Sequence, residues 1–301
     1  MPIPSDIQII TASSILGLKP SGVETLPSTL LSLGLQNKLH AQIPIIEVPA
    51  LNDLYTNRRD RQTNIINGDA LKRFSINLSL AIQGTDVDEK FLLVLGGDCS
   101  ILIGIMHALK SKGDYGLFFL DAHADFYEPE KSTTGETADM DLAIVTGRGP
   151  ELLTNISGTK PYVKDENVVH IGQRDMLEAK KYNSQDIRAT NMNCFDESLV
   201  HHIGVDATIS EIERKIQKNR VDGFWIHFDT DVIDDDSNPA VDYRLPGGLS
   251  FQECKDVLSS LTTRFPVIGM SVTIFNPSLD KDKSIARKLI TLLSEVIHQE
   301  G

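Results

Sequence analysis

The stretch Phe118-Phe119-Leu120-Asp121-Ala122-His123-Ala124-Asp125 decides the fold class and the first functional hypothesis. Its apolar start, which continues back to Leu117, is typical of a central strand that is covered on both faces. Alternate side chains of an extended chain share a face, so Asp121, His123 and Asp125 would point the same way if the chain stays extended. Two carboxylates and an imidazole in this arrangement indicate a metal site, and a strand end with solvated polar residues is the simpler alternative.

Two further apolar runs end in residues of the same kind. The segment Phe224-Trp225-Ile226-His227-Phe228 leads into Asp229-Thr230-Asp231, and the run 91–95 leads into Gly96-Gly97-Asp98-Cys99-Ser100. In an open α/β sheet, sites form outside the carboxyl ends of the strands, so these groups are expected to converge. Clustered carboxylates repel one another unless cations balance them, and two divalent ions that share carboxylates form a known hydrolytic device.

Strand-like runs alternate with helix-like runs along the chain, which predicts an α/β fold with a mostly parallel sheet and helices on both faces. We expect strands at residues 7–11, 43–48, 91–95, 117–120, 168–171, 224–228 and 267–272. We expect helices at 22–35, 71–83, 100–112, 208–218, 250–264 and 283–298, and Ser250 begins a capping-box pattern. No internal repeat or linker is evident, so residues 1–301 are predicted to form a single domain. The stretches 127–137 and 234–248 are predicted to be long loops that carry substrate contacts.

Composition and charge exclude several classes of protein. The chain of 301 residues has a formal net charge of -13, which argues against nucleic acid or anionic membranes as partners. No apolar run approaches the roughly 20 residues that span a bilayer. The segment MPIPSDIQIITASS lacks the basic and apolar regions of a secretory signal. Cys99, Cys194 and Cys254 are sparse and odd in number, like cytosolic thiols rather than a disulfide framework, so we expect a cytoplasmic protein.

The three motifs together resemble those of the ureohydrolase superfamily, which includes arginase, agmatinase and formiminoglutamase. That family has a Gly-Gly-Asp-His-Ser turn, an Asp-Ala-His-x-Asp strand end and a later Asp-x-Asp strand end, which match residues 96–100, 121–125 and 229–231 here. Residues 171–175 (Ile-Gly-Gln-Arg-Asp) and Asn276-Pro277 are further matches. The resemblance implies a three-layer α/β/α fold, two bound manganese ions, hydrolysis of a C–N bond in a guanidino-like group, and a homo-oligomer.

The resemblance also implies roles for individual residues. Asp121 and Asp229 would bridge the two metal ions. Asp125 would complete the first metal together with the residue at position 99, and His123 and Asp231 would complete the second. A hydroxide that bridges the metals would attack the guanidinium carbon, and Asp125 would orient it and relay its proton to the leaving amine.

The first departure from the family pattern is Cys99, where the family has histidine. A thiolate is a legitimate ligand, but it favours softer ions, so zinc, iron or nickel become alternatives to manganese. The other interpretation of Cys99 is a buried and inert thiol beside a weakened first metal site. Relatives that hydrolyse amino acids in antibiotic biosynthesis, among them a family that acts on N-hydroxyarginine, resemble this cysteine-containing pattern.

Further departures affect the residues that hold the substrate. The family's proton-shuttling histidine falls on Ala138, and the glutamate that grips the guanidinium falls on Ile274. The asparagine that contacts the α-carboxylate in arginases falls on Tyr127, and an acidic residue that contacts the α-amino group falls on Leu177. The metal-binding carboxylates are kept while the substrate contacts are lost, so we expect an active hydrolase whose substrate is not arginine.

Replacement residues can be nominated from the sequence. His227 lies two residues before Asp229, so we expect it to point into the site, where it would act as a catalytic proton shuttle, contact substrate, or support a metal ligand. Glu136 and Asp139 are candidates to bind a cationic guanidinium or amidinium, and solvated loop carboxylates are the alternative interpretation. Tyr127 is a third candidate for substrate binding, because it occupies a substrate-contact position of the resembled family.

Three functions are compatible with these residues. The leading hypothesis is a two-metal hydrolase that acts on a small guanidino, amidino or formimino compound. The second is a formimino or amide hydrolase that releases ammonia or formamide without urea. The third is a non-catalytic arginase-like protein that holds one metal ion or none. For the enzymes we expect a small cationic substrate, and Arg244 offers a contact if that substrate carries a carboxylate.

Overall fold

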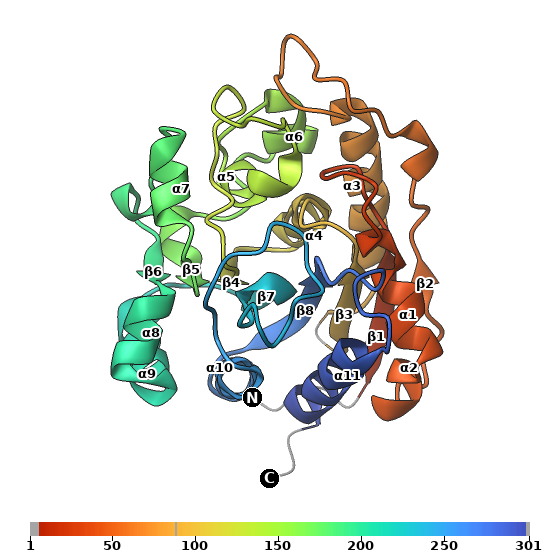
Figure 1. The fold of residues 1–301 in the computed structure, drawn as a ribbon, viewed down its shortest axis with the longest axis vertical. Coiled ribbons are helices and arrows are strands. Elements are labelled where there is room, and N and C mark those ends of the chain that lie inside the picture. The colour runs from red at the N-terminus through yellow and green to blue at the C-terminus, as the bar shows by residue number, and fades with distance from the viewer. Residues whose placement is uncertain (1–5, 88, 299–301) are drawn as a thin grey trace.

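A parallel sheet runs through the middle of the molecule in the computed structural model, which describes residues 6–87 and 89–298 (Figure 1). Its eight strands are ordered β2-β1-β3-β8-β7-β4-β5-β6, and each neighbouring pair is parallel. The strands are β1 (Ile7–Ala12), β2 (Ile46–Glu47), β3 (Phe91–Gly96), β4 (Tyr115–Leu120), β5 (Val168–Ile171), β6 (Asn193–Phe195), β7 (Gly223–Asp229) and β8 (Val267–Thr273). The predicted α/β fold with a mostly parallel sheet is therefore confirmed.

The strands lie where the sequence predicts them, with one exception. The sequence does not predict β6, because this strand is three residues long and only Phe195 in it is fully buried. β2 covers only Ile46–Glu47 of the predicted strand at 43–48. The single domain over residues 1–301 stays a prediction, and residues 1–5, on which the signal-peptide argument partly rests, lie outside the described residues.

Helices fill the connections between the strands. They are α1 (Leu26–Ser32), α2 (Leu35–Lys38), α3 (Gly68–Gln83), α4 (Ile101–Lys110), α5 (Asp141–Val145), α6 (Glu151–Thr154), α7 (Met176–Lys181), α8 (Glu197–Ile203), α9 (Val205–Ile216), α10 (Phe251–Arg264) and α11 (Ser284–Ile297). The predicted helix at 22–35 is wrong in its bounds, because Gly34 has a left-handed φ of 93° and separates α1 from α2. The capping box at Ser250 is confirmed, with Glu253 as its partner. Over residues 6–87 and 89–298, every helix is too short or too polar to cross a bilayer.

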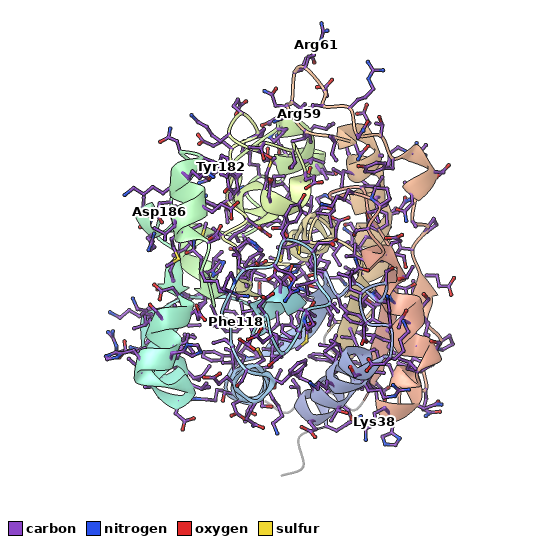
Figure 2. All side chains as sticks on the ribbon, in the orientation of Figure 1. Lys38, Arg59, Arg61, Phe118, Tyr182 and Asp186 are labelled. Carbon is purple, nitrogen blue, oxygen red and sulfur yellow. The ribbon has the colours of Figure 1, made fainter. Side chains whose placement is uncertain are left out.

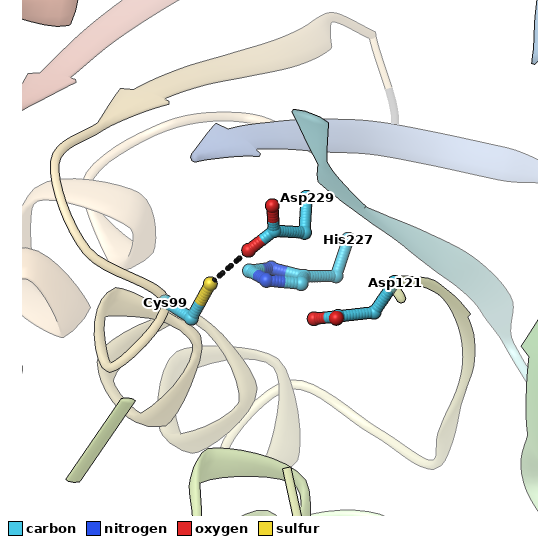
Figure 3. A group of neighbouring side chains, drawn as sticks. All are labelled: Cys99, Asp121, His227 and Asp229. Atoms are coloured by element: carbon cyan, nitrogen blue, oxygen red, sulfur yellow. Dashed lines mark hydrogen bonds between the residues drawn. The ribbon is translucent and has the colours of Figure 1, made fainter. Parts of the chain in front are cut away.

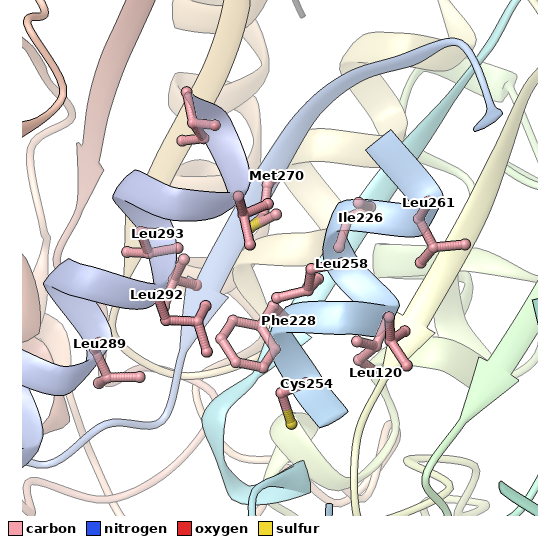
Figure 4. Close-up of a cluster of buried hydrophobic side chains, with 14 of the residues drawn as sticks. Leu120, Ile226, Phe228, Cys254, Leu258, Leu261, Met270, Leu289, Leu292 and Leu293 are labelled. Atoms are coloured by element: carbon pink, nitrogen blue, oxygen red, sulfur yellow. The ribbon is translucent and has the colours of Figure 1, made fainter. Parts of the chain in front are cut away.

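Helices cover both faces of the sheet, which confirms the three layers. One buried apolar cluster joins the sheet to α1, α2 and α8 to α11 and includes Phe118 and Leu120, and another joins it to α3 to α6 and includes Leu117 and Phe119. Alternate residues of β4 thus enter opposite cores, as a strand that is buried on both faces requires. Figure 4 shows the first cluster where α10 and α11 pack on β7 and β8. Figure 2 shows Phe118 among the packed side chains of the interior.

The register of the central strands aligns the ends that carry the candidate site. Leu120 of β4 pairs with Phe228 of β7, so Asp121 and Asp229 leave neighbouring strands at the same level. β8 separates β7 from β3, and β3 leads into the turn that carries Cys99. The three sequence motifs therefore meet at one edge of the sheet, outside the carboxyl ends of its strands.

The turn after β3 is fixed by a close approach of two backbone segments at Gly97. The Gly97 N–H donates to the Ala12 carbonyl at 3.2 Å, and the Asp98 N–H donates to the Ser14 carbonyl at 3.0 Å. A Cβ at Gly97 would lie 1.9 Å from the Ser14 carbonyl oxygen. Both groups belong to the backbone and neither can turn away, so only glycine fits at this position.

Gly97→Ala should therefore lower the free energy of unfolding by more than about 3 kcal/mol, the upper end of the usual cost of overpacking, or prevent folding. Gly84→Ala is the matched control, because a Cβ there would meet only carbonyl oxygens, at 3.5 Å and 3.6 Å. Its effect should stay within about 1 kcal/mol. Urea denaturation followed by circular dichroism measures both variants, and equal losses would contradict this account of the turn.

Candidate metal centre

Two turns of the same kind hold the acidic residues at the carboxyl edge of the sheet. Asp121 Oδ1 accepts the His123 N–H at 2.6 Å, and Asp229 Oδ1 accepts the Asp231 N–H at 2.8 Å. An aspartate that bonds the backbone two residues further on forms a turn. β4 has already ended here, and Asp125 has a left-handed φ of 44°. The expected alternation along an extended chain is therefore wrong, and turns rather than a strand bring these side chains together.

His123 faces two aspartates on one side of the cluster. Its Nδ1 lies 2.9 Å from Asp231 Oδ2 and 3.6 Å from Asp121 Oδ1. The other Asp231 oxygen accepts the Ala122 N–H at 3.1 Å. Asp121 Oδ2 is buried and has no hydrogen-bond partner among the described residues. One oxygen of Asp121 is thus left for a ligand that the chain itself does not provide.

Cys99 closes the other side of the cluster. Its Sγ donates a hydrogen bond to Asp229 Oδ2 at 2.6 Å and lies 3.4 Å from the Thr273 hydroxyl (Figure 3). Burial, and then the charge of Asp229, raise the pKa of the Cys99 thiol well above its usual value. Without a cation, Cys99 is therefore a protonated donor, and it would release that proton to solvent on binding a metal ion.

Burial and mutual repulsion set the protonation of the carboxylates. Burial, followed by the charge of Asp231, raises the pKa of Asp121 to about 7. Burial and neighbouring carboxylates also raise the pKa values of Asp125 and Asp229 well above the usual range. Burial opposes ionisation of Asp231 as well, but the charge of His123 outweighs it and lowers the pKa of Asp231. One imidazolium cannot balance this many carboxylates, so the cluster needs either protons or further cations.

The donor atoms of the cluster fit two divalent cations. Among the described residues, two overlapping groups have ligand atoms that all lie within 4.8 Å of one another: Cys99, Asp121, His227 and Asp229 in one, and Asp121, His123 and Asp125 in the other. Asp121 belongs to both groups, and its unpartnered oxygen suits such sharing. Carboxylate, imidazole and thiol donors are those that bind first-row transition metals. The predicted ligands thus come together, and their coordination of metal stays a prediction: Cys99, Asp121, His123, Asp125, Asp229 and Asp231.

Asp141 is a residue of the cluster that the sequence does not reveal. It begins α5 and is fully buried. Burial, followed by the charge of Asp121, raises the pKa of Asp141 well above its usual value, and neither oxygen of this carboxyl has a hydrogen-bond partner among the described residues. Asp141 therefore acts as a further buried acidic group of the cluster. An aspartate in the first turn of a helix is an ordinary feature, which hides this role in the sequence.

A cavity of about 270 Å³ opens onto the cluster, and its lining is rich in acidic side chains. Outside the cluster, the carboxylates and tyrosines of this lining are Tyr127, Glu136, Asp139, Asp175, Glu178, Tyr182, Asp242 and Tyr243. Arg244 also lines the cavity, but its guanidinium is held by the Asp235 carboxylate at 2.6 Å and 3.0 Å. The cavity is therefore strongly negative, and its arginine is already paired.

The three nominated substrate-binding residues all line this cavity. Glu136 accepts a hydrogen bond from the Tyr243 hydroxyl at 2.6 Å. Asp139 Oδ2 accepts one from the Ser132 hydroxyl at 2.8 Å, and its Oδ1 is buried without a hydrogen-bond partner in the described part of the chain. Burial raises the pKa of Asp139 to about 7. Asp139 therefore presents an oxygen that a cationic ligand can satisfy, and Tyr127 adds an aromatic wall.

Two positions at which the resembled family has acidic residues are apolar here. Ile274 lines the cavity with a backbone φ of 68°, which is strained for a β-branched residue. Leu177 is 86% exposed and is not part of the lining, although the neighbouring Glu178 is. The negative charge of the cavity thus comes from other positions than those of the family pattern.

His227 lies on the sheet side of the cluster and is not part of the cavity lining. Its Nδ1 is 2.9 Å from the Ser271 hydroxyl, and its ring stacks on Phe119 with 5.0 Å between centroids. Burial lowers the pKa of His227 to about 3, so the imidazole is neutral. This placement favours a role toward the metal cluster over a contact with substrate.

Known proteins share both the sequence pattern and the fold of this chain. The sequence model of the arginase family matches residues 34–298. The chain is 30% identical over 295 residues to arginase of Staphylococcus aureus (strain COL), with 95% of each chain covered. The solved structure of arginase from Bacillus caldovelox is similar with a TM-score of 0.85 and 27% identity, and the match covers 97% of this chain and 98% of that one. The formimidoylglutamase of Bacillus subtilis, at 18% identity and a TM-score of 0.70 over 99% of this chain and 87% of its own, shares the fold. The chain therefore belongs to the arginase family.

Proposed function

We propose that this chain holds two divalent ions and hydrolyses a C–N bond in a small cationic guanidino or amidino compound other than arginine. Members of the arginase family are hydrolases that act on C–N bonds of linear amidines. The proposed substrate class rests on the acidic cavity that opens directly onto the candidate metal cluster. A cavity of this charge selects a cation and rejects an anion.

The charge of the cavity argues against a substrate that carries a carboxylate. A guanidinium at the cluster would leave the rest of the substrate beside Asp175, Glu178 and Asp242. A carboxylate there would face like charges, and Arg244 could meet it only by leaving Asp235. An amine would instead be attracted, and a neutral tail would be tolerated. We therefore infer that the substrate differs from arginine at the end that carries the amino-acid group. At that end it has either a second cationic group or no charged group.

Individual residues then take distinct tasks. Glu136 and Asp139 bind the cationic group from the loop side, and Tyr127 packs against it. A pair of divalent ions in the cluster would supply a water that is activated at neutral pH. Asp125, which borders the cavity, is placed to accept a proton and to pass it to the leaving amine. Ile274 forms an apolar part of the cavity wall, so it shapes the cavity without adding charge.

The identity of the metal follows from the donor set. Carboxylates and His123 suit manganese, the metal of the family, whereas Cys99 favours zinc, iron or nickel. We propose a cytoplasmic location and a homo-oligomer on the resemblance to the family. The second candidate reaction, release of ammonia or formamide from a formimino or amide compound, is distinguished from urea release by its product. A non-catalytic protein is distinguished by a failure to bind two ions.

Agmatine and arginine, which differ by one carboxylate, test the proposal directly. The manganese-loaded protein should release urea from agmatine with a kcat/KM at least about tenfold higher than from arginine, which corresponds to roughly 1.4 kcal/mol of charge repulsion. A colorimetric urea assay with both compounds at matched pH and ionic strength measures the ratio. A preference for arginine would contradict the proposed selectivity, and ammonia without urea from formimino compounds would favour the second reaction.

Asp139→Asn should raise the KM for the cationic substrate about tenfold while kcat changes less, because the substitution removes binding charge and leaves the cluster intact. Asp206→Asn, on the exposed face of α9, is the control that removes the same charge far from the cavity. Steady-state kinetics of both variants gives the comparison. An unchanged KM in Asp139→Asn would show that Asp139 does not bind the substrate.

The metal-free protein should lose stability as the pH rises from 5.5 to 8. The pKa of Asp121 is about 7 in the folded chain, against about 3.9 when unfolded, so the folded chain binds more protons over this interval and its free energy of unfolding falls. Asp139, with a pKa of about 7, acts in the same direction. Thermal denaturation after chelator treatment measures this effect, and divalent ions added at pH 8 should restore stability. A metal-free protein whose stability is constant or rises over this interval would contradict the assignment.

A further inference from the structure

We propose that His227 coordinates the first metal ion through its Nε2, next to Cys99. The imidazole ligand of that ion would then come from β7, in the middle of the sheet. This inference rests on the proposed two-metal function and adds a ligand to it. The ligand atoms of Cys99, Asp121, His227 and Asp229 lie within 4.8 Å of one another. With bonds of about 2.0–2.3 Å, ligands on opposite sides of one ion are separated by roughly 4.4 Å, so small shifts close this group around a metal.

The direction of the side chains supports one shared ion. Figure 3 shows the His227 ring between Asp229 and Asp121, with its edge turned toward Cys99. His227 Nε2 and Cys99 Sγ each lie 3.4 Å from the Thr273 hydroxyl, so both atoms face the same small space. The Cys99 thiol donates its hydrogen bond to Asp229. A cation that displaces this proton would be met by thiolate, carboxylate and imidazole together.

The hydrogen bonds of His227 leave the correct nitrogen available. Its Nδ1 lies 2.9 Å from the Ser271 hydroxyl. The Ser271 oxygen also accepts the Trp225 Nε1–H at 3.1 Å, and the Ser271 O–H points to the Ile226 carbonyl at 3.5 Å. The Ser271 oxygen can therefore accept both N–H groups. A histidine that donates one ring N–H to a fixed acceptor keeps the lone pair of the other nitrogen for a metal. The hydrogen-bond neighbour of Nε2 is the Thr273 hydroxyl at 3.4 Å, near the outer limit of a hydrogen bond.

The sheet holds this imidazole in place before any metal binds. His227 pairs in register with Phe119 of β4 on one side and with Ser271 of β8 on the other. Phe119 stacks on the ring at an interplanar angle of 16°, and Ser271 fixes its rotation. The imidazole is fully buried. A ligand on a rigid strand, with its rotamer fixed on both sides, is a preorganised one.

The resulting donor set differs between the two ions. The first has a thiolate and an imidazole beside carboxylates, which favours zinc, iron or cobalt over manganese. The second has His123 with carboxylates, which suits manganese. The two ions should therefore bind with different affinities and different metal preferences, and a mixed pair is the expected form.

Cobalt(II) added to the chelator-treated full-length protein is the probe, because its absorption spectrum reports ligands without reference to activity. A thiolate-to-cobalt charge-transfer band should accompany one of two equivalents in the wild type. His227→Gln should weaken that equivalent by at least about a hundredfold and alter the visible ligand-field bands, while the charge-transfer band survives at high cobalt. Cys99→Ser should remove the charge-transfer band and leave the second equivalent in place.

His107→Gln is the matched control. His107 is also buried and its Nδ1 also lies 2.9 Å from a serine hydroxyl, that of Ser79, but it belongs to α4 and to neither group of ligand atoms. This variant should keep both equivalents and the wild-type spectrum. Loss of the first equivalent in both histidine variants would show a general effect of disturbing the core and would overturn the assignment of His227.

Proton NMR of cobalt-loaded wild type tests the ligand without any substitution. Coordination through Nε2 should give a hyperfine-shifted Nδ1–H resonance that exchanges slowly with water, because this proton is buried against Ser271. Absence of that resonance, or a folded His227→Gln with unchanged titration and spectrum, would make His227 a structural partner of Ser271 only. Failure of the wild type to bind two cobalt ions would instead overturn the proposed function itself.

Discussion

Repulsion among buried carboxylates is the constraint on which the rest of this structure depends. The aligned ends of β4 and β7 set Asp121 and Asp229 side by side, and the turns that follow bring Asp125 and Asp231 to the same place. Burial raises the pKa values of most of these groups, so the fold is held under electrostatic strain unless protons or cations relieve it. The backbone turns, the close contact at Gly97 and the partners of His123 all serve to keep these charges together.

Strand ends were predictable because long apolar runs carry a strong signal, and β3, β4, β7 and β8 lie where the sequence places them. The alternation expected beyond Leu120 fails, because aspartate side chains bond the backbone and turn the chain, which residue spacing cannot show. Asp141 and the Ser271 partner of His227 also escape the sequence, since both depend on contacts between distant segments. Glu136 and Asp139 could be nominated because their loop follows a strand end that carries candidate metal ligands.

The residues that differ from the family pattern lie on two sides of the carboxylate cluster, one toward the sheet and one toward the cavity. On the sheet side, Cys99 and His227 place sulfur and nitrogen atoms next to Asp121 and Asp229. On the solvent side, Ile274 is apolar while Glu136, Asp139 and their neighbours make the cavity negative. The carboxylates of the family motifs lie between the two sides, at Asp121, Asp125, Asp229 and Asp231. Changed metal preference and changed substrate preference are thus compatible with one conserved reaction type.

Metal content per chain tests the central claim most directly. The protein would be purified without chelator, dialysed at pH 8 against an excess of manganese or of zinc, freed of unbound ions, and analysed by plasma mass spectrometry together with its folded state by circular dichroism. The account predicts two divalent ions per folded chain, because two overlapping groups of ligand atoms share Asp121. A folded chain that retains no divalent ion at this pH would contradict it.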